Sequence, residues 1–152
     1  MASKRKVVQL SSVHATFDTR IFYKICTSLV KAGYDVDLII QHTKDEQING
    51  VNIKSLPIAK RKLDRPFKII PKLLFKAIKY PRGTVFHFHD PELIPVGFIL
   101  KLLGNKVIYD VHEDTVTDIR QKLYIPKFLR EFFVSGVRAF ESLAKKRSEE
   151  RR

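Results

Sequence analysis

The segment that most constrains the fold is the first part of the chain, which reads as a strand, a helix, a glycine and a second strand. Residues 6–11 are apolar at their centre, and residues 20–32 carry apolar side chains at helical spacing. Gly33 is a good helix terminator, and residues 34–40 form the next apolar strand. This order predicts two parallel strands joined by a right-handed crossover.

The same alternation continues along the chain. Asn49-Gly50 is a strong turn signal before a predicted strand over residues 51–56. The other predicted strands cover residues 84–88 and 106–110, and the other predicted helices cover Pro66 or Pro71 to Tyr80, 91–103 and 126–146. Residues 91–103 are so apolar that we expect this helix to be buried on most sides. Thr19 is the expected N-cap of the first helix.

This pattern predicts an α/β fold with a Rossmann-like, doubly wound and mostly parallel sheet. We expect one domain over residues 1–146 and a charged, disordered tail over residues 147–152. The single cysteine excludes an intramolecular disulfide and favours a reducing compartment. Cys26 shares a helical face with Phe22 and Val30, so we expect a buried, unreactive thiol.

The charge balance indicates a polyanionic partner, because 29 basic residues stand against 16 acidic ones and leave a net charge of +13. The richest segment runs from Lys60 to Arg82, where basic and apolar side chains alternate. We expect it to dock on an anionic membrane surface; a solvated basic helix face and nucleic-acid binding are the alternatives. The residues expected to bind the membrane are Lys60, Arg61, Lys62, Arg65, Lys68, Lys72 and Lys76.

No segment has the form of a signal peptide, and no uncharged run is long enough to cross a bilayer. We therefore expect a cytoplasmic protein, or one bound peripherally at the inner face of the membrane.

Three polar segments follow predicted strands, at residues 14–20, 87–92 and 110–114. Because the carboxyl ends of parallel strands meet at one edge of a sheet, these segments should converge on a ligand site. His87 and His89 should share one face of their strand. We expect His89, at the strand's end, to reach the cleft and His87 to be a hydrogen-bonded structural residue.

Other chemistries fit the sequence less well. His87, His89 and Asp90, with His112 and Glu113, offer nitrogen and oxygen ligands for a metal. The pattern is not H-E-x-x-H, however, and one cysteine cannot build a thiolate site, so no metal is predicted. The chain also lacks a G-x-S-x-G nucleophile elbow and, after the first strand, a G-x-G-x-x-G dinucleotide motif.

An ordered set of segments resembles the N-terminal domain of a family 4 glycosyltransferase, over roughly residues 5–145. These segments are Ser11-Ser-Val-His14 with Asp18-Thr-Arg-Ile, Leu29-Val-Lys-Ala-Gly-Tyr-Asp-Val36, His87-Phe-His89-Asp-Pro-Glu92 and Tyr109-Asp-Val-His-Glu113. Members are retaining enzymes with the GT-B architecture, in which two Rossmann-like domains face each other across a cleft. The resemblance implies hexosyltransferase-type transfer from a nucleotide-sugar to a hydroxyl of a glycan or lipid-linked acceptor, with no metal or other cofactor.

The resemblance also assigns roles to residues. His89 matches the histidine that lies beside the donor sugar and the acceptor, and is the expected catalytic residue. The residues expected to bind substrate are His14, Asp18, Arg20, Asp90, His112 and Glu113.

Two features depart from the family pattern. A Gly-Gly pair in the first loop is replaced by His-Ala-Thr-Phe-Asp at residues 14–18, and the C-terminal donor-binding domain is absent from this sequence. We expect that domain to be supplied in cis or in trans, and this chain alone to be inactive. The alternatives are a non-catalytic, membrane-docking subunit of a split glycosyltransferase and a basic nucleic-acid-binding domain.

Overall fold

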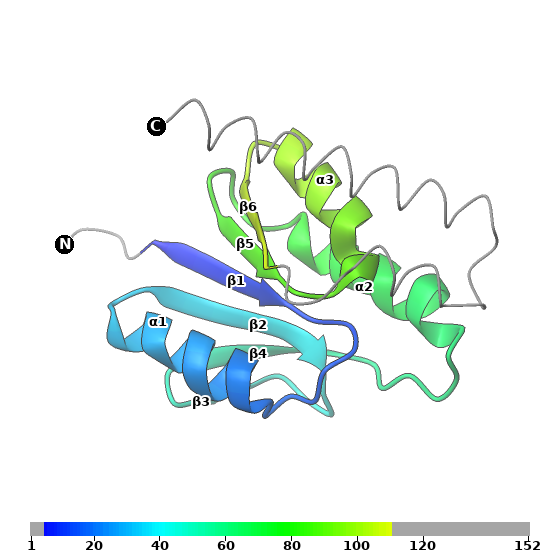
Figure 1. Cartoon of the computed structure of the whole chain (residues 1–152), viewed down its shortest axis with the longest axis horizontal. Helices are drawn as coiled ribbons and strands as arrows, with labels where there is room; N and C mark the ends of the chain where they lie inside the picture. Colours follow the sequence, from blue (N-terminus) through cyan, green and yellow to red (C-terminus); the bar gives the residue numbers. More distant parts are fainter. Residues whose placement is uncertain (1–4, 111–152) are drawn as a thin grey trace. The chain divides into compact units, whose positions relative to one another are not determined.

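The computed structural model describes residues 5–110. They form a six-stranded sheet in the order β3-β4-β2-β1-β5-β6, in which every neighbouring pair except β3 and β4 is parallel (Figure 1). The strands are β1 (Lys6–Leu10), β2 (Asp35–Gln41), β3 (Glu46–Ile48), β4 (Val51–Leu56), β5 (Val85–Phe88) and β6 (Lys106–Tyr109). The helix and tail expected after residue 125, and also His112 and Glu113, lie outside the described residues.

Helices cover both faces of the sheet. The helical segments are η1 (Thr19–Cys26), which runs into α1 (Thr27–Lys31); η2 (Arg65–Ile69), which runs into α2 (Ile70–Ala77); and η3 (Pro91–Leu93), which precedes α3 (Ile94–Leu102). η1 and α1 lie on one face, whereas α2 and α3 lie on the other (Figure 1). The chain is therefore doubly wound and Rossmann-like, as the sequence predicts, with β1 between the two halves.

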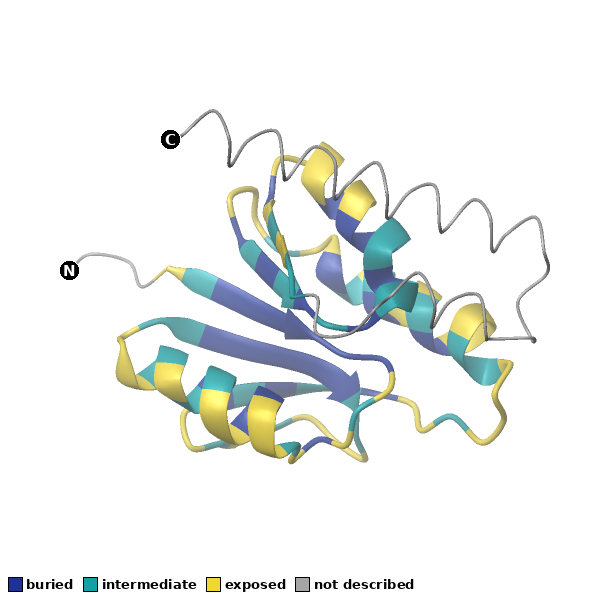
Figure 2. Cartoon of the chain, in the orientation of Figure 1, coloured by how far each residue is buried: buried dark blue, intermediate teal, exposed yellow. Residues whose placement is uncertain are grey.

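The two apolar cores follow the alternation of side chains along the strands. The central strands are buried over most of their length (Figure 2). In β5, Phe86 and Phe88 are buried against α2 and α3, whereas His87 points to the opposite face. In β2, Leu38 packs with η1 on one face and Ile39 with α2 on the other. Strands with apolar residues on both faces are typical of a parallel sheet covered on both sides.

Two local features differ from the sequence-based expectation. The first helix is capped by Asp18 rather than Thr19, because the Asp18 carboxylate accepts hydrogen bonds of 2.9 Å from both the Arg20 and Ile21 amides. The Asn49-Gly50 turn joins β4 to β3, a short antiparallel strand that the sequence pattern does not predict. Both turn residues have positive φ, as a tight hairpin requires.

Within residues 5–110, helix α3 is buried on one side only, which differs from the expectation of burial on most sides. Gly97 faces the sheet, where an added Cβ would lie 2.6 Å from Cε1 of Phe88. The missing side chain lets the helix approach β5 closely. Phe98 and Leu102 on the other side are exposed.

Cys26 is fully buried, as predicted, and burial raises the pKa of its thiol to about 12. A thiol with so high a pKa carries almost no thiolate at neutral pH.

At the amino ends of the strands, the buried carboxylate of Asp37 joins four segments. It lies 2.5 Å from Lys6 Nζ, 2.9 Å from Asn52 Nδ2 and 2.5 Å from the Tyr80 hydroxyl. Burial raises the pKa of Asp37, but these hydrogen bonds outweigh burial and hold the pKa below its ordinary value. The carboxylate form is thus the one that the fold stabilises.

We predict that Asp37→Asn lowers the free energy of unfolding by about 2–4 kcal/mol at neutral pH, because Lys6 loses its buried ionic partner. Since the folded-state pKa is depressed, the contribution of Asp37 is present above its unfolded pKa and is lost as the pH falls through the folded value. Urea denaturation at neutral and acidic pH should show the difference shrinking on acidification. The exposed control Asp45→Asn should cost less than about 1 kcal/mol; equal losses would contradict the prediction.

Candidate functional site

The carboxyl ends of β1 and β5 lie side by side, at the point where the chain passes from one half of the sheet to the other. Asp90 follows β5, and its side chain is only 3% exposed. One carboxylate oxygen, Oδ2, accepts the Ser12 amide at 2.6 Å and lies 3.1 Å from Ser11 Oγ and 3.0 Å from Ser12 Oγ. This single carboxylate therefore fixes the polar segment after β1 against the one after β5.

The other carboxylate oxygen of Asp90 lies 3.1 Å from Nε2 of His14. The hydrogen bond to Asp90 raises the pKa of His14 above its ordinary value, whereas partial burial of the ring acts in the opposite direction. Burial raises the pKa of Asp90, but its bonds to His14 and Ser12 outweigh burial and lower it. The pair is thus favoured as carboxylate and imidazolium, with the His14 ring half-exposed at the edge of the sheet.

His87 in β5 and His89 directly after it both lie close to Asp110, which directly follows β6. Nδ1 of His89 lies 3.3 Å and Nε2 of His87 3.9 Å from Oδ2 of Asp110, and the two rings are 4.7 Å apart. Nδ1 of His87 is also 2.8 Å from Nε2 of Gln9, so His87 is hydrogen-bonded as expected. The His89 side chain is 6% exposed, which places it at the inner end of the site.

The first polar segment reaches the same place through Arg20. Its Nη2 lies 3.4 Å from Oδ2 of Asp110, and about half of this arginine side chain is exposed. Asp18, in contrast, uses its carboxylate to cap η1, and the Ile21 and Arg20 amides lower its pKa. All three polar segments therefore converge as predicted, the third through Asp110.

A pocket of about 410 Å³ opens beside His14, at the carboxyl ends of β1 and β2. Its polar lining includes Thr16, Gln41, His42 and Arg65. His42 is held on both sides, with Nε2 2.5 Å from Glu46 Oε1 and Nδ1 3.1 Å from Thr16 Oγ1. His42 is not among the residues predicted from the sequence, although it lies directly after β2, as the predicted polar segments lie directly after their strands.

Among the described residues, His87, His89 and Asp110 offer three possible metal ligands within 4.8 Å of one another. Two histidines and a carboxylate are a ligand set that zinc accepts. The guanidinium of Arg20 already lies beside the same Asp110 oxygen. The expectation that this site works without a metal ion remains a prediction.

Ser11, Ser12 and Asp110 are further site residues that sequence reasoning missed. The two serines gain their role from the alignment of β1 with β5, which brings them to Asp90. The sequence feature that could have identified the two serines is a pair of small hydroxyl residues just beyond a strand, because such side chains readily form hydrogen bonds with nearby polar groups. Asp110 stood in the third polar segment but carried no assigned role.

No protein-family model matches the chain, and no curated protein sequence matches it. Two solved structures of sucrose-phosphate synthase from Thermosynechococcus elongatus do match. The first covers 90% of this chain with a TM-score of 0.62 and 17% sequence identity. The second covers 76% of this chain with a TM-score of 0.50 and 20% sequence identity. This chain has a glycosyltransferase-like fold. It spans 40% of the first neighbour's chain and 68% of the second's.

We predict that Asp90→Asn lowers the pKa of His14 toward the ordinary histidine value, because the hydrogen-bonded charge is removed. Because the pKa of His14 is raised and that of Asp90 is lowered, the pair stabilises the fold between the two folded-state pKa values. Its contribution is lost as the pH rises through the value of His14 or falls through that of Asp90. An NMR titration of the imidazole ¹⁵N signals measures the shift. Glu46→Gln, which touches His42 instead, should leave the His14 titration unchanged; a folded Asp90→Asn chain with an unshifted His14 would contradict the assignment.

Proposed function

We propose that this chain is the acceptor-side, N-terminal domain of a family 4, retaining glycosyltransferase. It would transfer a sugar from a nucleotide-sugar to a hydroxyl of a glycan or lipid-linked acceptor. The observation that carries the proposal is the convergence of His14, His89 and Arg20 at the carboxyl ends of β1, β5 and β6, on a glycosyltransferase-like fold. In open α/β sheets, this crevice is where ligands bind.

The pocket beside His14 is the proposed acceptor site. Its lining mixes hydroxyl, amide and cationic groups with apolar carbon, which suits a sugar or another polyhydroxylated acceptor. The ion pair with Asp90 favours the imidazolium form of His14, so this half-exposed ring can serve as a cationic donor in the lining of the pocket. Because Asp90 is itself fixed by Ser12, this donor needs little reorganisation when a ligand binds.

His89 is the proposed catalytic residue. Nδ1 of its imidazole lies 3.3 Å from Oδ2 of Asp110, an ionic contact that positions the ring at the carboxyl ends of β5 and β6. A positioned imidazole can stabilise charge that develops as the glycosidic bond breaks. Arg20 is the proposed contact for the donor phosphate, because its guanidinium is exposed at the same edge of the sheet.

The donor nucleotide would be held mainly by a second domain, in cis or in trans. This inference is supported by the coverage of the first neighbour, since the chain corresponds to 40% of that protein's chain. Without that domain the proposed site would lack most of its contacts to the donor, so we expect the chain alone to be inactive. Metal ions are not required in the proposed mechanism.

We predict that His89→Ala lowers kcat by about 10²–10³-fold with little change in the KM for the donor, because a preorganised charge-stabilising group is removed. The assay uses the chain joined to or mixed with its donor-binding domain, and measures nucleotide release from a panel of nucleotide-sugars. Lys24→Ala, at an exposed position of η1, is the control and should keep full activity.

Three outcomes separate the parts of this proposal. Full activity in His89→Ala would contradict the catalytic role alone. A donor-binding chain that is fully active without this domain would make the domain a non-catalytic subunit. No turnover of any nucleotide-sugar by the assembled protein would contradict the glycosyltransferase function itself.

A further inference from the structure

Helix α2 and its preceding turn η2 carry two apolar faces rather than one. Ile69, Leu73 and Ala77 are buried against the sheet. A second stripe, at helical spacing on the solvent side, consists of Phe67, Pro71, Phe75 and Ile78. A helix that packs on a sheet needs only one apolar stripe, so the second stripe is not explained by the fold.

This second stripe is well exposed. Phe67 is 76% and Phe75 62% exposed, and Ile78 is also exposed. Figure 2 shows exposed positions along η2 and α2 in yellow. Ile58 and Leu63, in the segment that leads into η2, are exposed as well. A contiguous set of large apolar side chains in water is unfavourable and usually marks an interaction site.

The charge around the stripe is almost entirely positive. Residues 57–82 contain nine basic side chains and a single acidic one, Asp64. Asp64 pairs with Lys68 at 3.0 Å and also accepts the backbone amides of Lys60 and Arg61. The side chains of Lys60, Arg61, Lys62, Lys72 and Arg82 have no ionic partner within the part of the chain that the structure describes.

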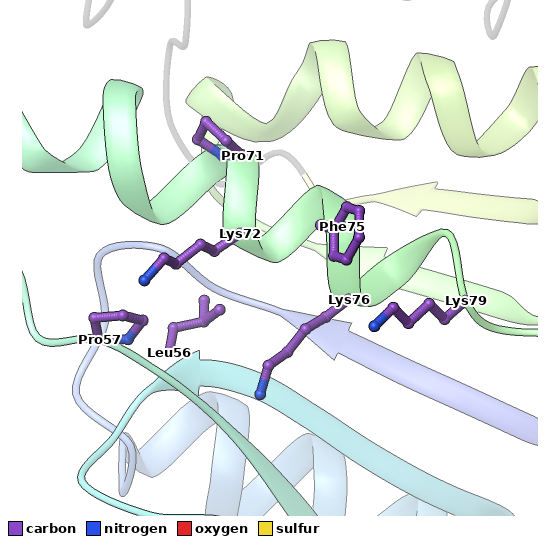
Figure 3. Close-up of a pocket in the computed structure, with 7 residues that line it drawn as sticks. All are labelled: Leu56, Pro57, Pro71, Lys72, Phe75, Lys76 and Lys79. Atoms are coloured by element: carbon purple, nitrogen blue, oxygen red, sulfur yellow. The ribbon is translucent and has the colours of Figure 1, made fainter.

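Figure 3 shows how the lysines of α2 lie around a hollow of about 440 Å³ next to Phe75. Lys72 and Lys76 extend toward the segment that carries Leu56 and Pro57. Lys76 is engaged there, because its Nζ donates to the Ser55 carbonyl at 2.7 Å. Nζ of Lys79 lies 4.7 Å from the centre of the Phe75 ring, so this cation stands directly beside the apolar stripe.

We propose that this basic apolar face, made of Phe67, Pro71, Phe75 and Ile78 with Lys68, Lys72 and Lys79 and the cations at residues 60–62, docks on an anionic phospholipid bilayer. The apolar stripe would enter the headgroup region while the lysines meet lipid phosphates. Lys76 and Arg65 are set apart from this face, because one is bonded to Ser55 and the other lines the pocket beside His14. None of the helices within residues 5–110 has the length and hydrophobicity to cross a bilayer.

The exposed apolar side chains favour a bilayer over a nucleic acid as the partner of this face. Phe67 and Phe75 could stack on bases, but Ile78 has no comparable interaction with a base or a phosphate, so a nucleic acid would leave the aliphatic part of the stripe without a partner. A bilayer interface takes aromatic and aliphatic groups together with cations. The docking proposal uses neither His89 nor the transferase reaction, and it can fail or succeed independently of them.

The test is sedimentation of the whole chain with vesicles of phosphatidylcholine alone or mixed with phosphatidylglycerol, at low and high salt. We expect binding to the anionic vesicles that weakens with salt, and little binding to the neutral ones. Lys72→Glu with Lys79→Glu should weaken binding at least about 20-fold. Lys24→Glu with Lys31→Glu, on η1 and α1, makes the same change in net charge and should weaken binding less than about threefold.

A second pair separates insertion from charge attraction. Phe67→Ser with Phe75→Ser should weaken binding about tenfold or more at constant charge, whereas Tyr23→Ser on η1 should have no effect. All replaced side chains are exposed, so circular dichroism and thermal unfolding should stay close to the wild type.

Four results would overturn the proposal. They are equal binding to neutral vesicles, equal losses in the two lysine pairs, unchanged binding of the phenylalanine variant, and binding to duplex DNA or RNA without binding to vesicles. A dimer that the phenylalanine variant abolishes, with no vesicle binding, would instead assign the stripe to a second copy of the chain.

Discussion

The buried carboxylate of Asp90 is the interaction on which the candidate site depends. A buried charge is strongly unfavourable unless it is paired and hydrogen-bonded, so the residues after β1 must supply its partners. The Ser12 amide and the His14 ring do so. The requirement to satisfy one carboxylate thereby fixes the spacing between two polar segments that lie far apart in the sequence. The carboxylate also raises the pKa of the His14 ring and so favours its protonated form.

Most of the fold could be predicted from the sequence, because each strand of a doubly covered sheet is a short apolar run and each helix repeats its apolar residues at helical spacing. The convergence of the polar segments followed from parallel pairing alone. The antiparallel strand β3 could not be predicted, since Glu46–Ile48 shows no pattern and depends on the Asn49-Gly50 turn. The exposure of Phe98 also escaped prediction, because hydrophobicity alone does not say which side of a helix meets the sheet.

The individual contacts of the site were beyond sequence reasoning. They depend on strand alignment, as in the pairing of Gln9 with His87, and on side chains that reach across strands, as Arg20 reaches Asp110. The same limit applies to the basic segment, where nothing in the pattern distinguishes Lys76, which is bonded to Ser55, from Lys72. Sequence identifies the chemical types at a sheet edge, and the three-dimensional alignment decides which of them meet.

Arg65 joins two surfaces that are otherwise separate. Its side chain lines the pocket beside His14, and it is the first residue of η2, two positions before Phe67. Because both residues belong to η2, a surface that holds Phe67 in place also holds the part of the pocket lining that Arg65 forms. If the face that carries Phe67 rests on a bilayer, docking would fix the distance between the pocket and the lipid phosphates. The proposed acceptor would then be selected by how far its hydroxyl stands above the membrane surface as well as by its chemical structure.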